Sequence, residues 1–151
     1  MHSERLFPKP LARWSEIEQS PEGNVAATLG REQQGTLLVD RMGLLARLYR
    51  YGNIAYVGGG FTDGIHSLLE AAAWGVPVIF GPDHEKFPEA QALIDVGAGV
   101  EVKTAEELKA ALHRWIADPS LLHSASEAAS RYVQERTGAA ESALVHVLKV
   151  I

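Results

Sequence analysis

Apolar and polar positions alternate along the chain in a pattern typical of strands that are joined by helices. Four short apolar runs have the length of buried strands. They span residues 35–40, 53–57, 76–80 and 99–102. Between and after these runs, apolar residues recur every three or four positions, which predicts helices. The predicted helices span residues 42–51, 65–74, 88–96 and 104–117. This alternation favours a parallel sheet with helices on both faces.

The two ends of the chain follow different patterns. Residues 1–24 are weakly patterned, with one candidate short strand at 11–17. Near the other end, Thr104-Ala105-Glu106-Glu107 is a capping box that opens an amphipathic helix. Asp118-Pro119 ends that helix, and Gly138 is expected to separate two further helices. These helices are predicted at 120–136 and 139–150.

Three consecutive glycines, Gly58 to Gly60, end the second predicted strand and precede a helix. In this order of elements, backbone N–H groups come close to a phosphate, and the helix N-terminus carries about half a positive charge. Glu70 lies on the side of the helix that a ribose could reach, because Leu68 and Leu69 are expected to face the core. The alternative is a tight turn in an α/β fold that binds nothing.

A second loop, residues 81–86, follows the strand at 76–80. The carboxyl ends of neighbouring parallel strands meet at one edge of a sheet, and ligands of open α/β sheets bind there. The two loops are therefore expected to border one crevice. Within the second loop, Asp83-His84-Glu85 has metal-binding side chains. Such groups occur often by chance on loops, so no metal site is predicted.

Composition narrows the function classes. The chain has 151 residues, of which 46% are hydrophobic and 22% charged, which is ordinary for a globular domain. A net charge of -5 without a basic block argues against nucleic acid as a partner. The absence of cysteine excludes disulfides and thiolate chemistry. No apolar run approaches the roughly 20 residues of a membrane span. A cytoplasmic protein is expected.

Several segments carry a family resemblance. They are Asp40–Leu45, Ala55–Phe61, Gly64–Glu70, Gly75–Pro82, Lys86-Phe87 and Glu89-Ala90. Together they resemble the carboxyl-terminal, donor-binding half of 3-deoxy-D-manno-octulosonic acid (Kdo) transferases, which are glycosyltransferases of the GT-B type. The resemblance continues to about Glu107 and covers about two-thirds of the chain.

The resemblance implies a fold and a reaction. The fold is a Rossmann-like α/β domain, the carboxyl-terminal half of a GT-B enzyme. The reaction moves Kdo from CMP-Kdo to a lipid A precursor in lipopolysaccharide biosynthesis, at the cytoplasmic face of the inner membrane. CMP-Kdo is a substrate, so no cofactor is expected. Residues 1–151 would form one donor-binding domain, a fragment that lacks the amino-terminal acceptor domain and the first part of this domain.

The resemblance also implies roles for individual residues. His66 would donate to the CMP phosphate or the Kdo carboxylate, Glu70 would accept from both ribose hydroxyls, and Lys86 would pair with an anionic group. Ser67 stands where the family more often has Asn, which weakens one expected contact. The substrate-binding residues implied are Met42, Gly43, Gly58, Gly59, Gly60, Phe61, Gly64, Ile65, His66, Ser67, Glu70 and Lys86.

No catalytic residue is expected in this chain, because the family's general base lies in the acceptor domain. The isolated chain should therefore turn nothing over. Two weaker matches are an Asp-x-x-Gly turn from Asp40 to Gly43, which the family places beside the cytidine, and an Arg-x-Ser segment from Arg13 to Ser15. Leu44 departs from the family, where many members have Glu.

Three alternatives stay open at this point. The chain could be the donor-binding half of a GT-B enzyme that uses a UDP-sugar, either a transferase or an epimerase. It could be a non-catalytic nucleotide-sugar-binding subunit. It could also be an α/β domain without a nucleotide. Because the family's first strand lies upstream, an open sheet edge is expected, and such an edge favours pairing with a second copy.

Overall fold

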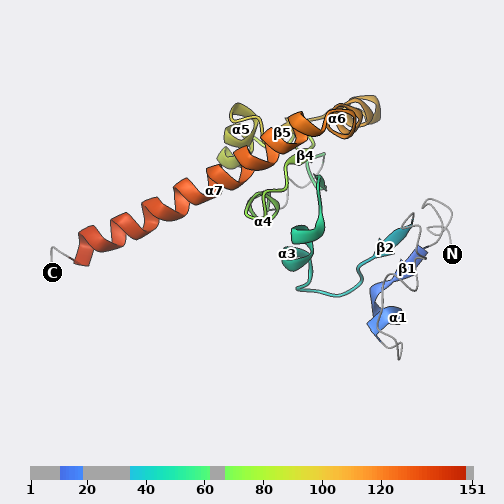
Figure 1. The fold of residues 1–151 in the computed structure, drawn as a ribbon, viewed down its shortest axis with the longest axis horizontal. Helices are drawn as coiled ribbons and strands as arrows, with labels where there is room; N and C mark the ends of the chain where they lie inside the picture. Colours follow the sequence, from blue (N-terminus) through green and yellow to red (C-terminus); the bar gives the residue numbers. More distant parts are fainter. Residues whose placement is uncertain (1–10, 19–34, 62–66, 149–151) are drawn as a thin grey trace. The chain divides into compact units, whose positions relative to one another are not determined.

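A computed structural model describes residues 11–18, 35–61 and 67–148 (Figure 1). The chain forms two compact units, Met1–Leu45 and Ala46–Ile151. Among the described residues, no helix combines the length and the apolar character needed to cross a membrane.

The first unit contains a two-stranded parallel sheet. Strand β1 (Leu11–Arg13) pairs with β2 (Thr36–Leu38), and helix α1 (Trp14–Glu18) follows β1 directly. The strand predicted over 11–17 is therefore too long. Helix α1 starts early because the Asp40 carboxylate accepts hydrogen bonds from the N–H and the hydroxyl of Ser15, at 3.0 and 2.6 Å. A carboxylate at a helix start satisfies a free N–H group and favours the helix.

The second unit is built around three parallel strands in the order β3-β4-β5. Ala55, Val78 and Gly99 lie side by side in this sheet. From Leu45 onward the elements are α3 (Leu45–Leu48), the 3₁₀ helix η2 (Tyr49–Tyr51), β3 (Ala55–Val57), α4 (Leu69–Ala72), β4 (Val78–Phe80), α5 (Pro88–Asp95), β5 (Gly99–Glu101), α6 (Ala105–Ala117) and α7 (Pro119–Leu148).

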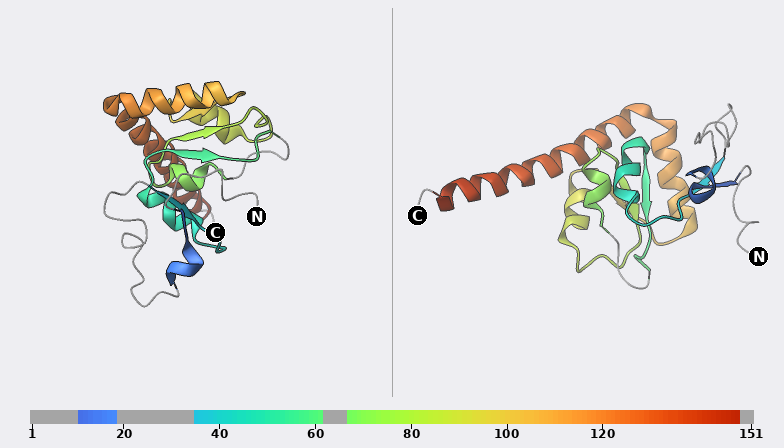
Figure 2. Two further views of the ribbon diagram at one scale, coloured as in Figure 1. Left: turned by 90° about the vertical axis from the view of Figure 1, so that its right-hand side faces the viewer. Right: turned by 90° about the horizontal axis from the view of Figure 1, so that it is seen from below.

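Helices cover both faces of the three-stranded sheet, as Figure 2 shows for α6 on one side of the strands and α4 on the other. Because side chains alternate along a strand, Val78 and Phe80 pack toward α4, α5 and α7, whereas Ile79 packs toward α6 and the start of α7. The expected α/β fold, with parallel strands between helices and helices at the carboxyl end, is confirmed.

Two predicted helices are shorter than expected. The helix predicted at 42–51 consists of α3 and η2 only, because Gly43 has φ +81°. That left-handed backbone interrupts the helix before Leu45. Met42 is fully exposed, so it contributes nothing to a buried face of a helix.

Helix α4 also starts later than predicted. It begins at Leu69, and Ser67 is not helical. Leu68, Ala71 and Ala72 form its buried side. Leu69 does not belong to this buried side, and its side chain is 37% exposed. The expectation that Leu69 faces the core is therefore wrong.

The helices at the carboxyl end agree better with their sequence signals. The Thr104 hydroxyl accepts from the Glu107 N–H at 3.2 Å, while the Glu107 carboxylate accepts from the Lys103 N–H at 2.6 Å. In the standard capping box the glutamate would accept from the N–H of Thr104 itself, whereas here it accepts from the residue before it. Helix α7 continues through Gly138, where a break was predicted. A glycine inside a helix costs only about 1 kcal/mol relative to alanine, so it need not end a long one.

Candidate functional site

Two loops meet at the carboxyl edge of the three-stranded sheet. Gly58–Gly60 follow β3, and Gly81 follows β4, which is the neighbouring parallel strand. The Asp83 N–H donates to the Gly60 carbonyl at 2.8 Å. The prediction that these two loops lie side by side at this edge is confirmed.

Two glycines of these loops, Gly59 and Gly81, are required, one by its backbone conformation and the other by the available space. Gly59 has φ +94°, which L side chains rarely adopt. Gly81 has no such backbone, but a Cβ atom there would lie 2.5 Å from the Gly60 carbonyl oxygen and 2.7 Å from its carbon. The chain therefore brings two stretches of backbone closer together than any side chain permits.

The predicted site residues of the second unit that the structure describes differ in exposure, and Gly58 and Gly59 are half-buried. Phe61, Ser67, Glu70 and Lys86 are exposed, and Gly60 is buried. Gly64, Ile65 and His66 lie outside the described residues. The part of the turn that was expected to meet a phosphate most closely is thus not described.

Glu70 lies on the side of α4 that faces η2. Burial of the Tyr49 hydroxyl, and then the negative charge of Glu70, raises the pKa of Tyr49. Glu70 itself is exposed. A carboxylate in this position is free to accept hydrogen bonds from hydroxyl groups of a ligand, and the predicted contact with a ribose stays a prediction.

Met42 and Gly43, the remaining predicted site residues, belong to the first unit and are exposed. The two weaker family matches in this unit contact each other, since Ser15 binds the Asp40 carboxylate. The Ser15 hydroxyl lowers the pKa of Asp40. Asp40 therefore has a structural role in joining β2 to α1.

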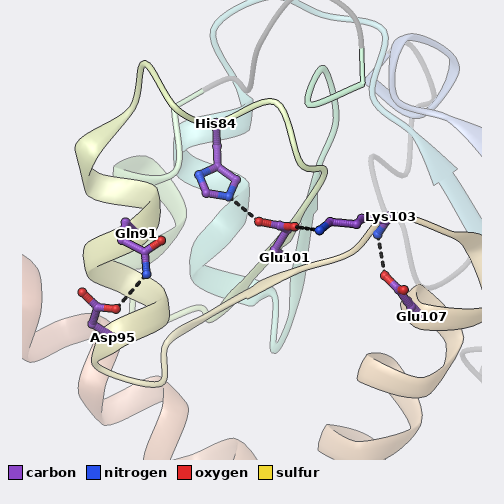
Figure 3. Close-up of polar contacts among 6 residues, drawn as sticks. All are labelled: His84, Gln91, Asp95, Glu101, Lys103 and Glu107. Atoms are coloured by element: carbon purple, nitrogen blue, oxygen red, sulfur yellow. Dashed lines mark hydrogen bonds and ion pairs between the residues drawn. The ribbon is translucent and has the colours of Figure 1, made fainter.

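One cluster at the carboxyl edge was not predicted (Figure 3). His84 Nε2 lies 2.7 Å from Glu101 Oε2, and Lys103 Nζ lies 3.1 Å from Glu101 Oε1. Glu101 ends β5, next to β4, so the rule that brought the glycine loops together also brings Glu101 to His84. The hydrogen bond from His84 is the main cause that holds the pKa of Glu101 below its usual range, and the hydrogen bond from Lys103 acts in the same direction.

The lowered pKa of Glu101 predicts a dependence of stability on pH. The ionised carboxylate is favoured in the folded state, so its contribution is full above the unfolded pKa, about 4.3. This stabilising contribution is lost as the pH falls below that value and through the pKa of Glu101 in the folded protein. Thermal melts of the wild type and Glu101→Gln between pH 3 and 7 check this. The two melting temperatures should approach each other at low pH, and a constant difference would contradict the prediction.

Other parts of the described structure offer no better-developed site. Among the described residues, no group of three His, Cys, Asp or Glu side chains could hold a metal ion. An open groove of about 440 Å³ is lined by residues of α7 together with Trp74 and Gly75. This groove contains none of the predicted site residues, so the carboxyl edge remains the candidate site.

In a comparison with known proteins, the chain is similar to several proteins of one name. The chain is 49% identical over 74 residues to the 3-deoxy-D-manno-octulosonic acid transferase of Aquifex aeolicus (strain VF5), a match that spans 48% of this chain and 21% of the relative. It is 43% identical over 70 residues to the enzyme of that name from Chlamydophila psittaci (strain ATCC VR-125 / 6BC), spanning 44% of this chain and 16% of the relative. No family model matches the chain.

A solved structure has the same fold. It is the C-terminal CMP-Kdo binding domain of WaaA from Acinetobacter baumannii, with a TM-score of 0.66 and 23% sequence identity, and the match covers 82% of this chain and 61% of that one. The resemblance to Kdo transferases stated from the motifs is thus confirmed. The chain matches about a fifth or less of the length of these curated relatives.

Proposed function

We propose that this chain is the donor-binding part of a Kdo transferase, and that it holds CMP-Kdo at the carboxyl edge of β3 and β4. The observation that carries the proposal is the 49% identity over 74 residues to a Kdo transferase. The contact between Asp83 and Gly60 supports it, because it holds the two glycine loops together at the edge where α/β sheets bind nucleotides.

The geometry changes how the phosphate would be held. Helix α4 has only four residues, so few peptide dipoles are aligned behind the glycine turn. We therefore assign the phosphate mainly to backbone N–H groups of the glycine turn. Lys86, an exposed residue of the second loop, would add a positive charge. Gly58–Gly60 let the phosphate approach the backbone closely.

In the proposed reaction, the bond between the anomeric carbon of Kdo and a phosphate oxygen breaks, and the carbon bonds to a hydroxyl oxygen of the lipid A precursor. CMP leaves as a phosphate monoester, and the hydroxyl proton goes to a general base. This chain would neutralise charge on the leaving phosphate. The general base and the acceptor site would come from the amino-terminal part of the enzyme, so this chain alone should bind CMP without turnover.

Thermal shift measurements with CMP, UMP and UDP test the proposal. A ligand that binds only the folded state raises the melting temperature according to its affinity. CMP should raise it more than either uridine nucleotide at equal concentration. A larger shift with UDP would favour the donor-binding half of a UDP-sugar enzyme, and no shift with any nucleotide would contradict the proposal.

Replacing Glu70 with glutamine should weaken CMP binding about tenfold or more, because hydrogen bonds to a charged acceptor are stronger than those to a neutral one. The melting temperature without ligand should barely change, since the Glu70 side chain is exposed. Calorimetric titration with CMP and a thermal melt of each form measure both effects. Equal affinity combined with a large loss of stability would instead make Glu70 a structural residue.

We also propose that the complete enzyme works at the cytoplasmic face of the inner membrane, since its acceptor would be a lipid A precursor. Its contact with the membrane would come from parts of the protein outside this chain. Fractionation of cells that produce the complete enzyme tests this location. Recovery of the enzyme in the cytosolic fraction alone, with none on membranes, would contradict it.

Pairing of two copies is a further part of the proposal. In the described structure, β3 is at one end of the three-stranded sheet, and Tyr56 on it is 48% exposed. An exposed edge strand presents unpaired N–H and C=O groups, with which a strand of another chain can pair. Light scattering at high concentration should detect a dimer that Tyr56→Lys abolishes. A wild-type chain that stays monomeric would rule out this pairing.

A further inference from the structure

The loop between β4 and α5 is folded back on itself around His84. The His84 N–H donates to the Pro82 carbonyl at 2.9 Å, and the Phe87 N–H donates to the His84 carbonyl at 2.8 Å. The same loop carries the Asp83 N–H that binds Gly60. His84 is therefore part of the same turn that brings Asp83 to Gly60.

His84 is also the part of this loop that is anchored in the protein. Between residues 82 and 86 it is the one buried side chain, with 9% of its surface exposed, whereas Asp83, Glu85 and Lys86 are exposed. Its ring meets the Phe80 ring edge-on, with centroids 5.3 Å apart and an interplanar angle of 83°.

The polar end of the His84 ring is fixed from a different strand. Glu101 Oε2 lies 2.7 Å from Nε2, and Lys103 binds the other carboxylate oxygen of Glu101 (Figure 3). Because β5 is hydrogen-bonded to β4, the carboxylate attaches the loop to the sheet. A charged acceptor also makes this a strong hydrogen bond.

We propose that His84 and Glu101 are positioning residues for the donor crevice. Through their hydrogen bond they hold the loop of residues 81–87 where the Asp83 N–H reaches the Gly60 carbonyl, and so they fix the spacing of the two glycine loops. Neither residue is among those predicted to touch the donor. This inference rests on the proposed function, because the effect on affinity needs a donor nucleotide.

Two measurements on the full chain test this inference. The first is the CMP dissociation constant, taken well below the melting temperature so that every variant is folded. The second is the amide exchange rate of Asp83, compared with that of Val102, whose N–H donates to the Phe80 carbonyl. The variants are His84→Ala, Glu101→Ala, the double variant and His84→Gln. Gln91→Ala is the matched control, because it removes a hydrogen bond to Asp95 on the surface of α5.

His84→Ala and Glu101→Ala should each weaken CMP binding about tenfold and speed exchange at Asp83, but not at Val102. The double variant should be no worse than either single one, since both remove the same hydrogen bond. His84→Gln should recover part of the loss, because its amide can donate to Glu101. Gln91→Ala should match the wild type in both measurements.

The outcomes separate this inference from the proposed function. If the wild type binds CMP and the alanine variants bind it equally well, His84 and Glu101 do not position the crevice. If the alanine substitutions lower only the melting temperature, the role of His84 and Glu101 is purely structural. If the wild type does not bind CMP, the proposed function fails. The exchange rate of Asp83 still decides whether the pair holds the loop, and unchanged exchange would overturn the inference.

Discussion

Replacing Phe80 with alanine should lower the free energy of unfolding of the second unit by about 3–5 kcal/mol. Phe80 is fully buried on the central strand, where it packs among residues of α4, α5 and α7. Its removal loses apolar burial and leaves a cavity that close-packed neighbours fill only in part. This loss is a large share of the 5–15 kcal/mol that stabilises a typical domain. Urea unfolding followed by circular dichroism measures it.

Phe61→Ala is the matched control for this prediction. Phe61 follows the neighbouring strand β3, but 47% of its surface is exposed. The same chemical change there should cost far less, because little apolar surface returns to water. Equal losses at the two positions would mean that the packing around Phe80 is not what stabilises the unit.

Gly81→Ala should both destabilise the second unit, by about 1–3 kcal/mol, and weaken CMP binding about tenfold or more. A Cβ atom at this position would lie 2.5 Å from the Gly60 carbonyl oxygen, so the backbone of one loop has to move. That movement would stretch the hydrogen bond between Asp83 and Gly60, which holds the two loops together. Urea unfolding and titration with CMP measure the two effects.

The control for the Gly81 prediction is Gly58→Ala. A Cβ atom at Gly58 would meet nothing within 4 Å, and its φ is not in the left-handed region. Its stability should therefore stay close to that of the wild type. If Gly81→Ala were equally stable, the close approach of the two loops would be less strict than the distances indicate.

The sequence predicted those features that local patterns determine. The runs at 76–80 and 99–102 contain β4 and β5, and the helix predicted at 88–96 ends one residue beyond α5. The glycine loops were expected at one edge because parallel strands end together. Strand lengths were overestimated, since apolar runs continue into the turns that flank each strand.

Other features could not be predicted because they depend on contacts between distant residues. Helix α1 replaces part of a predicted strand because Asp40 binds Ser15, 25 positions away. His84 and Glu101 are 17 positions apart, and nothing in either segment indicates the other. His84 was considered only together with its neighbours Asp83 and Glu85, as a chance group of metal-binding side chains. Placing Glu101 at the end of the adjacent strand would have identified its partner.

The central place of β4 has a consequence for how the second unit folds. In the described sheet, β3 and β5 both pair with β4 and not with each other. The side chains of β4 also enter both apolar clusters, one on each face of the sheet. Neither apolar cluster can form until β4 is in place, and detachment of β4 would expose both clusters to water. The two sides of the sheet should therefore fold and unfold cooperatively, as one kinetic unit, with no stable half-folded form.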